Sequence, residues 1–544
     1  MVRSRDAWDP RRLAPAALAA ALAAAYLLWQ PPSLDLAAAE YRAWLFGHAG
    51  FTLWNAQWYG GHHVPGYSVV FPPLAFWLGP RVLGALAVVA TAVVFEPLAH
   101  GRYGERAWLG ATAFAAGAAA NLFSGRITFV LGLPLALAAL LALQRDRRGI
   151  ALALALLTPL ASPVDALFLA LAGTAYALAT RRAIGIALAT AAMTPVLALA
   201  LLFPEGGVEP FGFTSLWPVL VLAPLALLLV LPRAEHALRI GVALYLLGCL
   251  AAFAIDTPVG SNVVRLGALA GGPLAALVLW PRRALLLALL TPFLLWWQWT
   301  PPISDISVTI DDPSVHAAYF APLLAELGRL GASGNGVAAA AGRLEIPFTR
   351  VHWEARWVAP QIPLARGWER QLDVARNSVF YTDGGREAAP LTPASYATWL
   401  RANAVRWVAL PDVPFDFSAQ PEVRLIRRGL PYLRPVWRDA HWRLYAVVGA
   451  VPLASPPAQV LRAGTDSLSL RVPRPAVVRL HIRWSPYWAV TRGDACVAPD
   501  GDWTQVRIGR SGSVELGMRF SAARIGAHGA RCEDRNGIGR QQPR

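Results

Sequence analysis

The chain has 544 residues, of which 56% are hydrophobic and only 15% are charged. A soluble domain carries about 25% charged residues, so this composition and the mean hydropathy of +0.42 exclude an ordinary soluble protein. The net charge of +16 comes from arginines that are scattered between apolar runs, which disfavours a nucleic-acid-binding surface.

Apolar runs long enough to cross a membrane follow one another up to about residue 300. The segment 149–182 has arginines at both ends and Thr-Pro and Ser-Pro pairs in its middle, which predicts a tight helical hairpin. Counting the hairpin as two, we expect about eleven spans, with the others near 13–30, 81–98, 107–121, 127–143, 184–203, 214–231, 238–255, 264–280 and 284–299. The first run resembles a signal peptide, but its length and the spans that follow favour an uncleaved helix.

The arginine-rich loops alternate with the spans so that all of them fall on one side of the membrane, which the positive-inside rule assigns to the cytosol. The other side then receives the loop 31–66 and everything after residue 300. We therefore predict a polytopic α-helical membrane bundle with a cytosolic N-terminus and an extracytoplasmic C-terminal part.

Past residue 300 the pattern changes. Helix and strand signals alternate over 301–450 and predict an α/β domain, whereas period-two alternation over 451–533 predicts a small β-sandwich. The last residues, 534–544, read as a disordered tail. Cys496 and Cys532 would lie outside the cytosol, where a disulfide between them is plausible, and no Cys/His spacing predicts a metal site.

The first outer loop begins with an acid. Asp35 can act as a general base for an acceptor hydroxyl, or bind a divalent cation together with a phosphate, or simply cap a helix. Glu40 and Arg42 follow on the same predicted helix as candidates for substrate binding; a pair with a nearby arginine is the structural alternative for Glu40.

The same loop is rich in aromatic residues. Trp54 and Trp58 are candidates for stacking on a sugar or lipid, and an interfacial aromatic belt is the alternative that we favour. His62 and His63 follow Gly60-Gly61, a turn expected to expose both rings, and contact with substrate is more plausible there than metal ligation.

Two arginines depart from the positive-inside trend. Arg126 and Arg265 lie at predicted outer ends of spans, where a guanidinium can hold a lipid-linked phosphate with paired donors. Snorkelling to headgroups is the alternative for both. Arg265, beside a Gly-Ser-Asn turn, is the stronger candidate.

Segments of the chain resemble the GT-C class of membrane glycosyltransferases. They are "LDLAAAEYRAWLFGHAG", "WNAQWYGGHHVPGYS", "GRITFVLGLPLALAAL", "LASPVDALF" and "TPVGSNVVRLG". The resemblance implies a bacterial cytoplasmic membrane protein that uses a polyprenyl-phosphate-linked sugar, with Asp35 as the catalytic aspartate of the first outer loop. An envelope glycan or lipid would be the acceptor, and a divalent cation is open as a cofactor.

The competing hypothesis is a non-catalytic membrane protein of envelope assembly, either a transporter or a scaffold. A transporter is expected to have internal repeats and polar residues at the membrane midplane. We find no repeat, and the polar residues gather at the predicted outer ends of the spans. A scaffold predicts a filled mouth with no cavity near Asp35.

Overall fold

The computed structural model describes residues 10–331, 342–381, 390–521 and 532. They form two compact units. The membrane unit comprises Met1–Ala43, Tyr67–Ala200 and Gly206–Asp311. The C-terminal unit comprises Trp44–Gly66, Leu201–Glu205 and Asp312–Arg544, so it contains two short segments that lie within the span-bearing half of the sequence.

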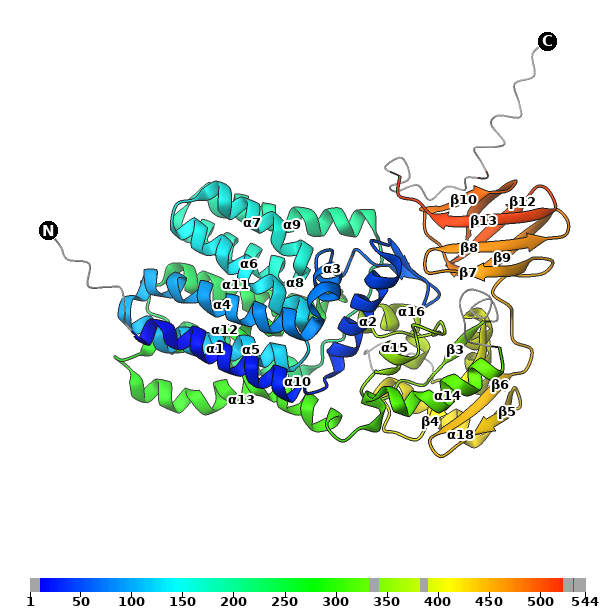
Figure 1. The fold of residues 1–544 in the computed structure, drawn as a ribbon. Helices are drawn as coiled ribbons and strands as arrows, with labels where there is room; N and C mark the ends of the chain where they lie inside the picture. The colour runs from blue at the N-terminus through cyan, green and yellow to red at the C-terminus, as the bar shows by residue number, and fades with distance from the viewer. Residues whose placement is uncertain (1–9, 332–341, 382–389, 522–531, 533–544) are drawn as a thin grey trace, which may run out of the picture. The chain divides into compact units, whose positions relative to one another are not determined.

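The membrane unit is helical (Figure 1). Its apolar helices are α1 (Pro10–Trp29), α4 (Pro80–Tyr103), α5 (Ala107–Phe123), α6 (Ile127–Gln144), α7 (Arg148–Ala161), α8 (Pro163–Thr180), α9 (Ala183–Leu202), α10 (Phe213–Leu225) with η2 (Ala226–Val230), α11 (His236–Ala254), α12 (Val264–Leu279) and α13 (Ala284–Thr309). Within the described residues, nine helical stretches are long and apolar enough to cross a membrane, and one of these, Pro80–Phe123, contains both α4 and α5. The chain is therefore a multi-pass membrane protein, as predicted.

The predicted helices and the observed ones agree closely. Most predicted helix ends lie within a few residues of the observed ends. The agreement is close because apolar runs and the arginine-bearing turns between them mark where each helix begins and ends. The hairpin forms as α7 and α8, and the Ser162 hydroxyl at its break accepts a hydrogen bond from the backbone N–H of Asp165. The largest difference is α13, which continues ten residues beyond the expected end at 299 and passes through Pro301 and Pro302. The number of spans and their orientation stay predictions.

The α/β part of the C-terminal unit contains a four-stranded sheet in the order β3-β4-β6-β5. The strands are β3 (Arg343–Glu345), β4 (Val405–Pro411), β5 (Leu433–Arg438) and β6 (Trp442–Val447), with β3 parallel to β4 and the other pairs antiparallel. The longer helices are α14 (Ala317–Arg329), α17 (Pro393–Ala402) and α18 (Gln420–Arg428). The strand that we expected in "GVAAAA" and the predicted tail lie outside the described residues.

The β-sandwich has a four-stranded sheet, β10-β13-β8-β7, and a three-stranded sheet, β11-β12-β9. In Figure 1 these strands lie side by side in orange and red. Their bounds are β7 (Gln459–Ala463), β8 (Ser467–Val472), β9 (Ala476–Arg483), β10 (Trp488–Arg492), β11 (Ala495–Asp500), β12 (Trp503–Ile508) and β13 (Gly512–Met518). Alternate side chains of both sheets form one apolar core. A disulfide joins Cys496 on β11 to Cys532, with their Cα atoms 5.1 Å apart.

Charged side chains occupy part of the α/β core. Arg366 donates two hydrogen bonds to Asp373, at 3.0 and 2.5 Å, and its guanidinium lies 3.7 Å from Glu422. Tyr396 donates to the other Glu422 oxygen at 2.7 Å. Glu345 is fully buried, and neither of its carboxylate oxygens has a hydrogen-bond partner within the described part of the chain.

Asp373, Glu345 and Glu422 are buried around one guanidinium, that of Arg366, and burial shifts the pKa of an acid. Burial, followed by the charge of Glu422, raises the pKa of Glu345 well above its usual value. Burial raises the pKa of Glu422 to about 7, although Arg366 and the hydrogen bond from Tyr396 act in the opposite direction. Burial therefore disfavours the charged forms of both Glu345 and Glu422.

Candidate functional site

Asp35 lies in the first turn of α2 (Leu34–Ala49), directly after two prolines and a serine. Its side chain is 41% exposed, and one carboxylate oxygen lies 3.9 Å from Nε of Arg126. A neighbouring hydrogen bond, donated by Thr309 of α13 to the carbonyl of Pro32 at 2.9 Å, holds the start of this helix. The structure thus brings together two of the residues singled out in the sequence, the acid of the first loop and the arginine before α6.

A glycine sets the position of Arg126. Gly125 has a φ of +73°, and a Cβ atom at this position would overlap the hydroxyl of Ser33 and lie 2.8 Å from the backbone nitrogen of Leu36. Only glycine adopts this conformation and approach at low cost. The turn between α5 and α6 therefore packs directly against the start of α2, and this packing places Arg126 beside Asp35.

Arg126 retains capacity to donate hydrogen bonds. Its Nε is buried without a hydrogen-bond partner among the described residues, and its contact with Asn121 is long, at 3.4 Å. The 3.9 Å separation from Asp35 is an ion pair rather than a hydrogen bond. A guanidinium in this state can bind an anionic oxygen without first breaking a strong internal bond.

A second acid, Asp305, joins this site from α13. It interacts electrostatically with Arg126, Asp35 and Arg265. Asp305 was not among the residues that we expected at the site, because it lies beyond Pro301-Pro302, where we expected the last span to have ended. A signal was present in the sequence: Asp305 is an acid a few residues past the end of an apolar run, in the same kind of position as Asp35.

Arg265 completes the group at the start of α12. It interacts with Arg126, Asp35 and Glu209, and its guanidinium lies 5.8 Å from the ring centroid of Phe129. The preceding turn is held by a hydrogen bond of 3.2 Å from Ser261 to Glu209. We call Asp35, Arg126, Arg265 and Asp305 the Asp35 cluster.

The other two candidates on α2 have structural neighbours. Arg42 is buried, with its guanidinium 3.6 Å from the ring centroid of Tyr67. Glu40 interacts electrostatically with Tyr26, over whose ring Arg81 lies at 5.6 Å. A role for either residue in substrate binding stays a prediction.

The aromatic segment of the first loop belongs to the C-terminal unit. Trp54 and Trp58 are fully buried, and Trp54 lies in the sandwich core with its ring centroid 5.8 Å from that of Trp488. His62 stacks on Trp58 at 6.0 Å. The expected exposure of His62 and His63 is wrong, since they are 4% and 5% exposed, and burial also rules out the membrane-interface belt for these tryptophans.

His63 joins a buried polar series. Its Nδ1 lies 2.8 Å from Glu205 and its Nε2 lies 3.0 Å from the Ser485 hydroxyl, while Arg376 binds the other oxygen of Glu205. Burial acts to raise the pKa of Glu205, but the charge of Arg376 and the hydrogen bond from His63 lower it to about 2. Ser485 is fully buried, and this series fixes the segment Leu201–Glu205 within its unit. A role in substrate binding for Trp54, Trp58, His62 or His63 stays a prediction.

The described residues contain no group of three or more His, Cys, Asp or Glu side chains placed to hold a metal ion. The Asp35 cluster contains two carboxylates, those of Asp35 and Asp305. Carboxylate oxygens are the ligands that a divalent cation uses. Metal binding there stays a prediction.

No protein-family model matches the sequence, and no curated protein matches it. Among solved structures, the chain is similar to ArnT from Cupriavidus metallidurans in the apo state, with a TM-score of 0.38 and 14% sequence identity over 77% of this chain and 94% of that chain.

Proposed function

We propose that the protein is a membrane glycosyltransferase of the GT-C type. It moves a sugar from a polyprenyl-phosphate donor to an acceptor of the cell envelope on the outer face of the cytoplasmic membrane. The Asp35 cluster is the proposed active site.

The observation that carries the proposal is the pairing of an accessible carboxylate with two arginines at one end of an apolar helical bundle. Asp35 is 41% exposed, and Nε of the nearby Arg126 has no hydrogen-bond partner among the residues that the structure describes. A phosphate-linked lipid needs apolar helices for its chain and cationic donors for its phosphate, and the membrane unit supplies both.

In the proposed reaction, the carboxylate of Asp35 accepts the proton of the acceptor hydroxyl as its oxygen attacks the anomeric carbon of the sugar. The bond between that carbon and the phosphate oxygen breaks, and its electron pair leaves with the polyprenyl phosphate. Arg126 and Arg265 stabilise the charge that develops on the leaving phosphate. Asp305 keeps both guanidinium groups oriented.

The proposed role of Asp35 as the base for the acceptor hydroxyl predicts the effect of replacing it. Asp35→Asn keeps the shape of the side chain and removes the base, so we expect envelope glycan assembly to fail in a complemented deletion strain. Asp311→Asn is a matched control, because Asp311 is an exposed acid of the same unit outside the cluster. If Asp35→Asn complements as well as the wild type, Asp35 is not the base, and a scaffold becomes the better explanation.

A further inference from the structure

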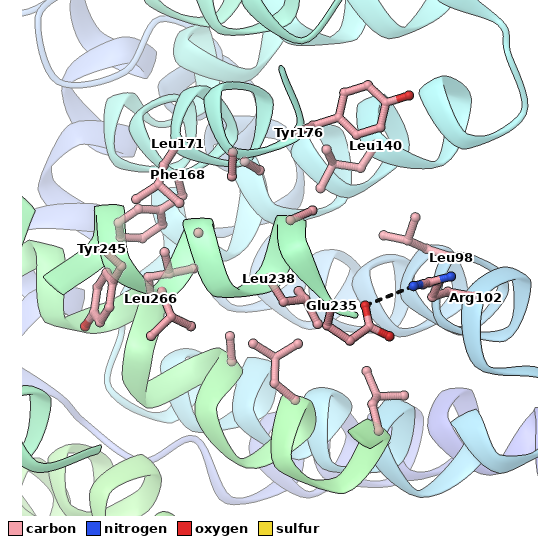
Figure 2. Close-up of a pocket in the computed structure, with 18 of the residues that line it drawn as sticks. Leu98, Arg102, Leu140, Phe168, Leu171, Tyr176, Glu235, Leu238, Tyr245 and Leu266 are labelled. Carbon is pink, nitrogen blue, oxygen red and sulfur yellow. Dashed lines mark hydrogen bonds and ion pairs between the residues drawn. The ribbon is translucent and has the colours of Figure 1, made fainter. Parts of the chain in front are cut away.

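Helices of the membrane unit line a partly open chamber of about 1510 Å³. Apolar side chains from several helices form most of its wall, as Figure 2 shows for Leu140, Leu171, Leu238 and Leu266. Pockets for small ligands have volumes of about 300–1,000 Å³. This chamber therefore exceeds what a small polar metabolite fills, and its wall suits alkyl chains.

The two ends of the chamber differ. One end is formed by Phe168, Tyr245 and Leu266 (Figure 2, left). The opposite end contains Arg102 and Glu235, which form an ion pair of 3.0 Å. The ends of the helices at this second end are the arginine-rich turns that the positive-inside rule assigns to the cytosol.

The second end is basic. Among the residues that the structure describes, the lining includes Arg102, Arg148 and Arg182 together with the carboxylates of Asp146 and Glu235. The turn that contains Asp146 and Arg148 follows Gln144, which donates a hydrogen bond to the carbonyl of Leu98 at this end. Two arginines are matched by carboxylates, since Arg148 lies 3.0 Å from Asp146 and Arg102 pairs with Glu235. The third, Arg182, makes only a long contact of 3.4 Å with the hydroxyl of Tyr176, so the rim carries an excess of positive charge.

We propose that this chamber binds an anionic phospholipid of the cytoplasmic leaflet. The headgroup phosphate lies at the basic rim against Arg182 and Arg102, and the acyl chains lie between α8, α11 and α12. Basic pockets between helices on the cytoplasmic side are suited to anionic headgroups, and the rim lies at the other end of the chamber from the wall residue Leu266 that adjoins Arg265. The site is separate from the Asp35 cluster and does not depend on the proposed glycosyl transfer.

Native mass spectrometry of the full chain, with phosphatidylglycerol or phosphatidylcholine added in detergent, tests the proposal. We expect the protein to retain phosphatidylglycerol preferentially. Arg182→Ala and Arg102→Ala should each weaken this retention about fivefold, the effect of one arginine at an anionic surface. Arg282→Ala is the matched control, because Arg282 is exposed in the turn between α12 and α13 and does not line the chamber.

A second variant tests the chamber itself. Ala172 lies in the wall on α8, and Ala172→Trp should reduce the retention of phosphatidylglycerol while every rim charge is kept. Thermal unfolding of each variant without lipid identifies any that fail to fold. Equal retention of the two lipids by the wild type would overturn the proposal, as would an effect of Arg282→Ala that equals that of Arg182→Ala. Undiminished binding by a folded Ala172→Trp protein would show that the lipid binds elsewhere.

Discussion

The substitution Glu422→Gln should stabilise the C-terminal unit at alkaline pH. Burial raises the pKa of Glu422 to about 7, whereas the same group in the unfolded chain titrates near its usual value of 4.5. The stability that the protonated Glu422 contributes is therefore fully present below pH 4.5 and is lost as the pH rises through 7. The reason is that, as the pH rises, the unfolded chain releases the proton of Glu422 at a lower pH than the folded chain does.

The size of the effect follows from the width of this window. Each pH unit in it costs about 1.4 kcal/mol, so the wild type loses roughly 3 kcal/mol of unfolding free energy between pH 5 and pH 8 through this group. Glutamine resembles the protonated side chain and can still accept the hydrogen bond that Tyr396 donates. We expect the variant to unfold at a similar temperature to the wild type at pH 5 and about 6 to 12 °C higher at pH 8.

Scanning calorimetry of the full chain in detergent at the two pH values measures this difference. Glu515→Gln is the control, because Glu515 lies on the sandwich surface with a side chain that is 43% exposed. Using the difference between variant and wild type removes the contributions of all other titrating groups. A difference that is the same at pH 5 and pH 8 would refute the assignment of a raised pKa to Glu422.

Three further substitutions test the packing around the sites. Gly125→Ala should lower glycosyl transfer on the order of 10- to 100-fold in a purified assay without unfolding the protein, because the arginine that follows would be displaced from the acid; wild-type activity would contradict the proposed geometry. Reduction of the Cys496–Cys532 disulfide, or replacement of both cysteines by serine, should lower the free energy of unfolding by about 4 kcal/mol, given the length of the loop that the disulfide closes. Calorimetry with and without reductant measures this, and an unchanged unfolding temperature would contradict it. Glu205→Gln should destabilise the C-terminal unit by about 3 kcal/mol at pH 7, because Arg376 loses the carboxylate that pairs with it. This loss of stability should vanish as the pH falls from 4.5 towards 2, where the wild-type ion pair is lost as well. A loss that persists at pH 2, measured by calorimetry, would contradict the ion-pair account.

The spans were predictable because they depend on local properties. Apolar length and the placement of arginines define each helix without reference to its neighbours, and the Ser-Pro break at 162–163 located the turn of the hairpin. The strands of the sandwich were predictable for the same reason, since alternation marks each one separately.

The contacts between distant segments were not predictable in this way. Trp54 packs in the core of the sandwich more than 400 residues later in the chain, and nothing in its local pattern distinguishes it from a tryptophan at a membrane interface. Asp305 was missed because α13 continues through two prolines, which end most helices. Conversely, Asp35 and Arg126 were identified singly by their positions at the ends of spans, and the structure adds their proximity.

Transfer of a labelled sugar by the purified protein tests the central claim most directly. The assay supplies a polyprenyl-phosphate-linked sugar and a membrane-extract acceptor, and it follows both the labelled product and the released polyprenyl phosphate. The account predicts transfer by the wild type and by Asp311→Asn, a loss of at least 100-fold in Asp35→Asn, and a smaller loss in Arg126→Gln through weaker stabilisation of the leaving phosphate. Transfer by Asp35→Asn at the wild-type rate would contradict it.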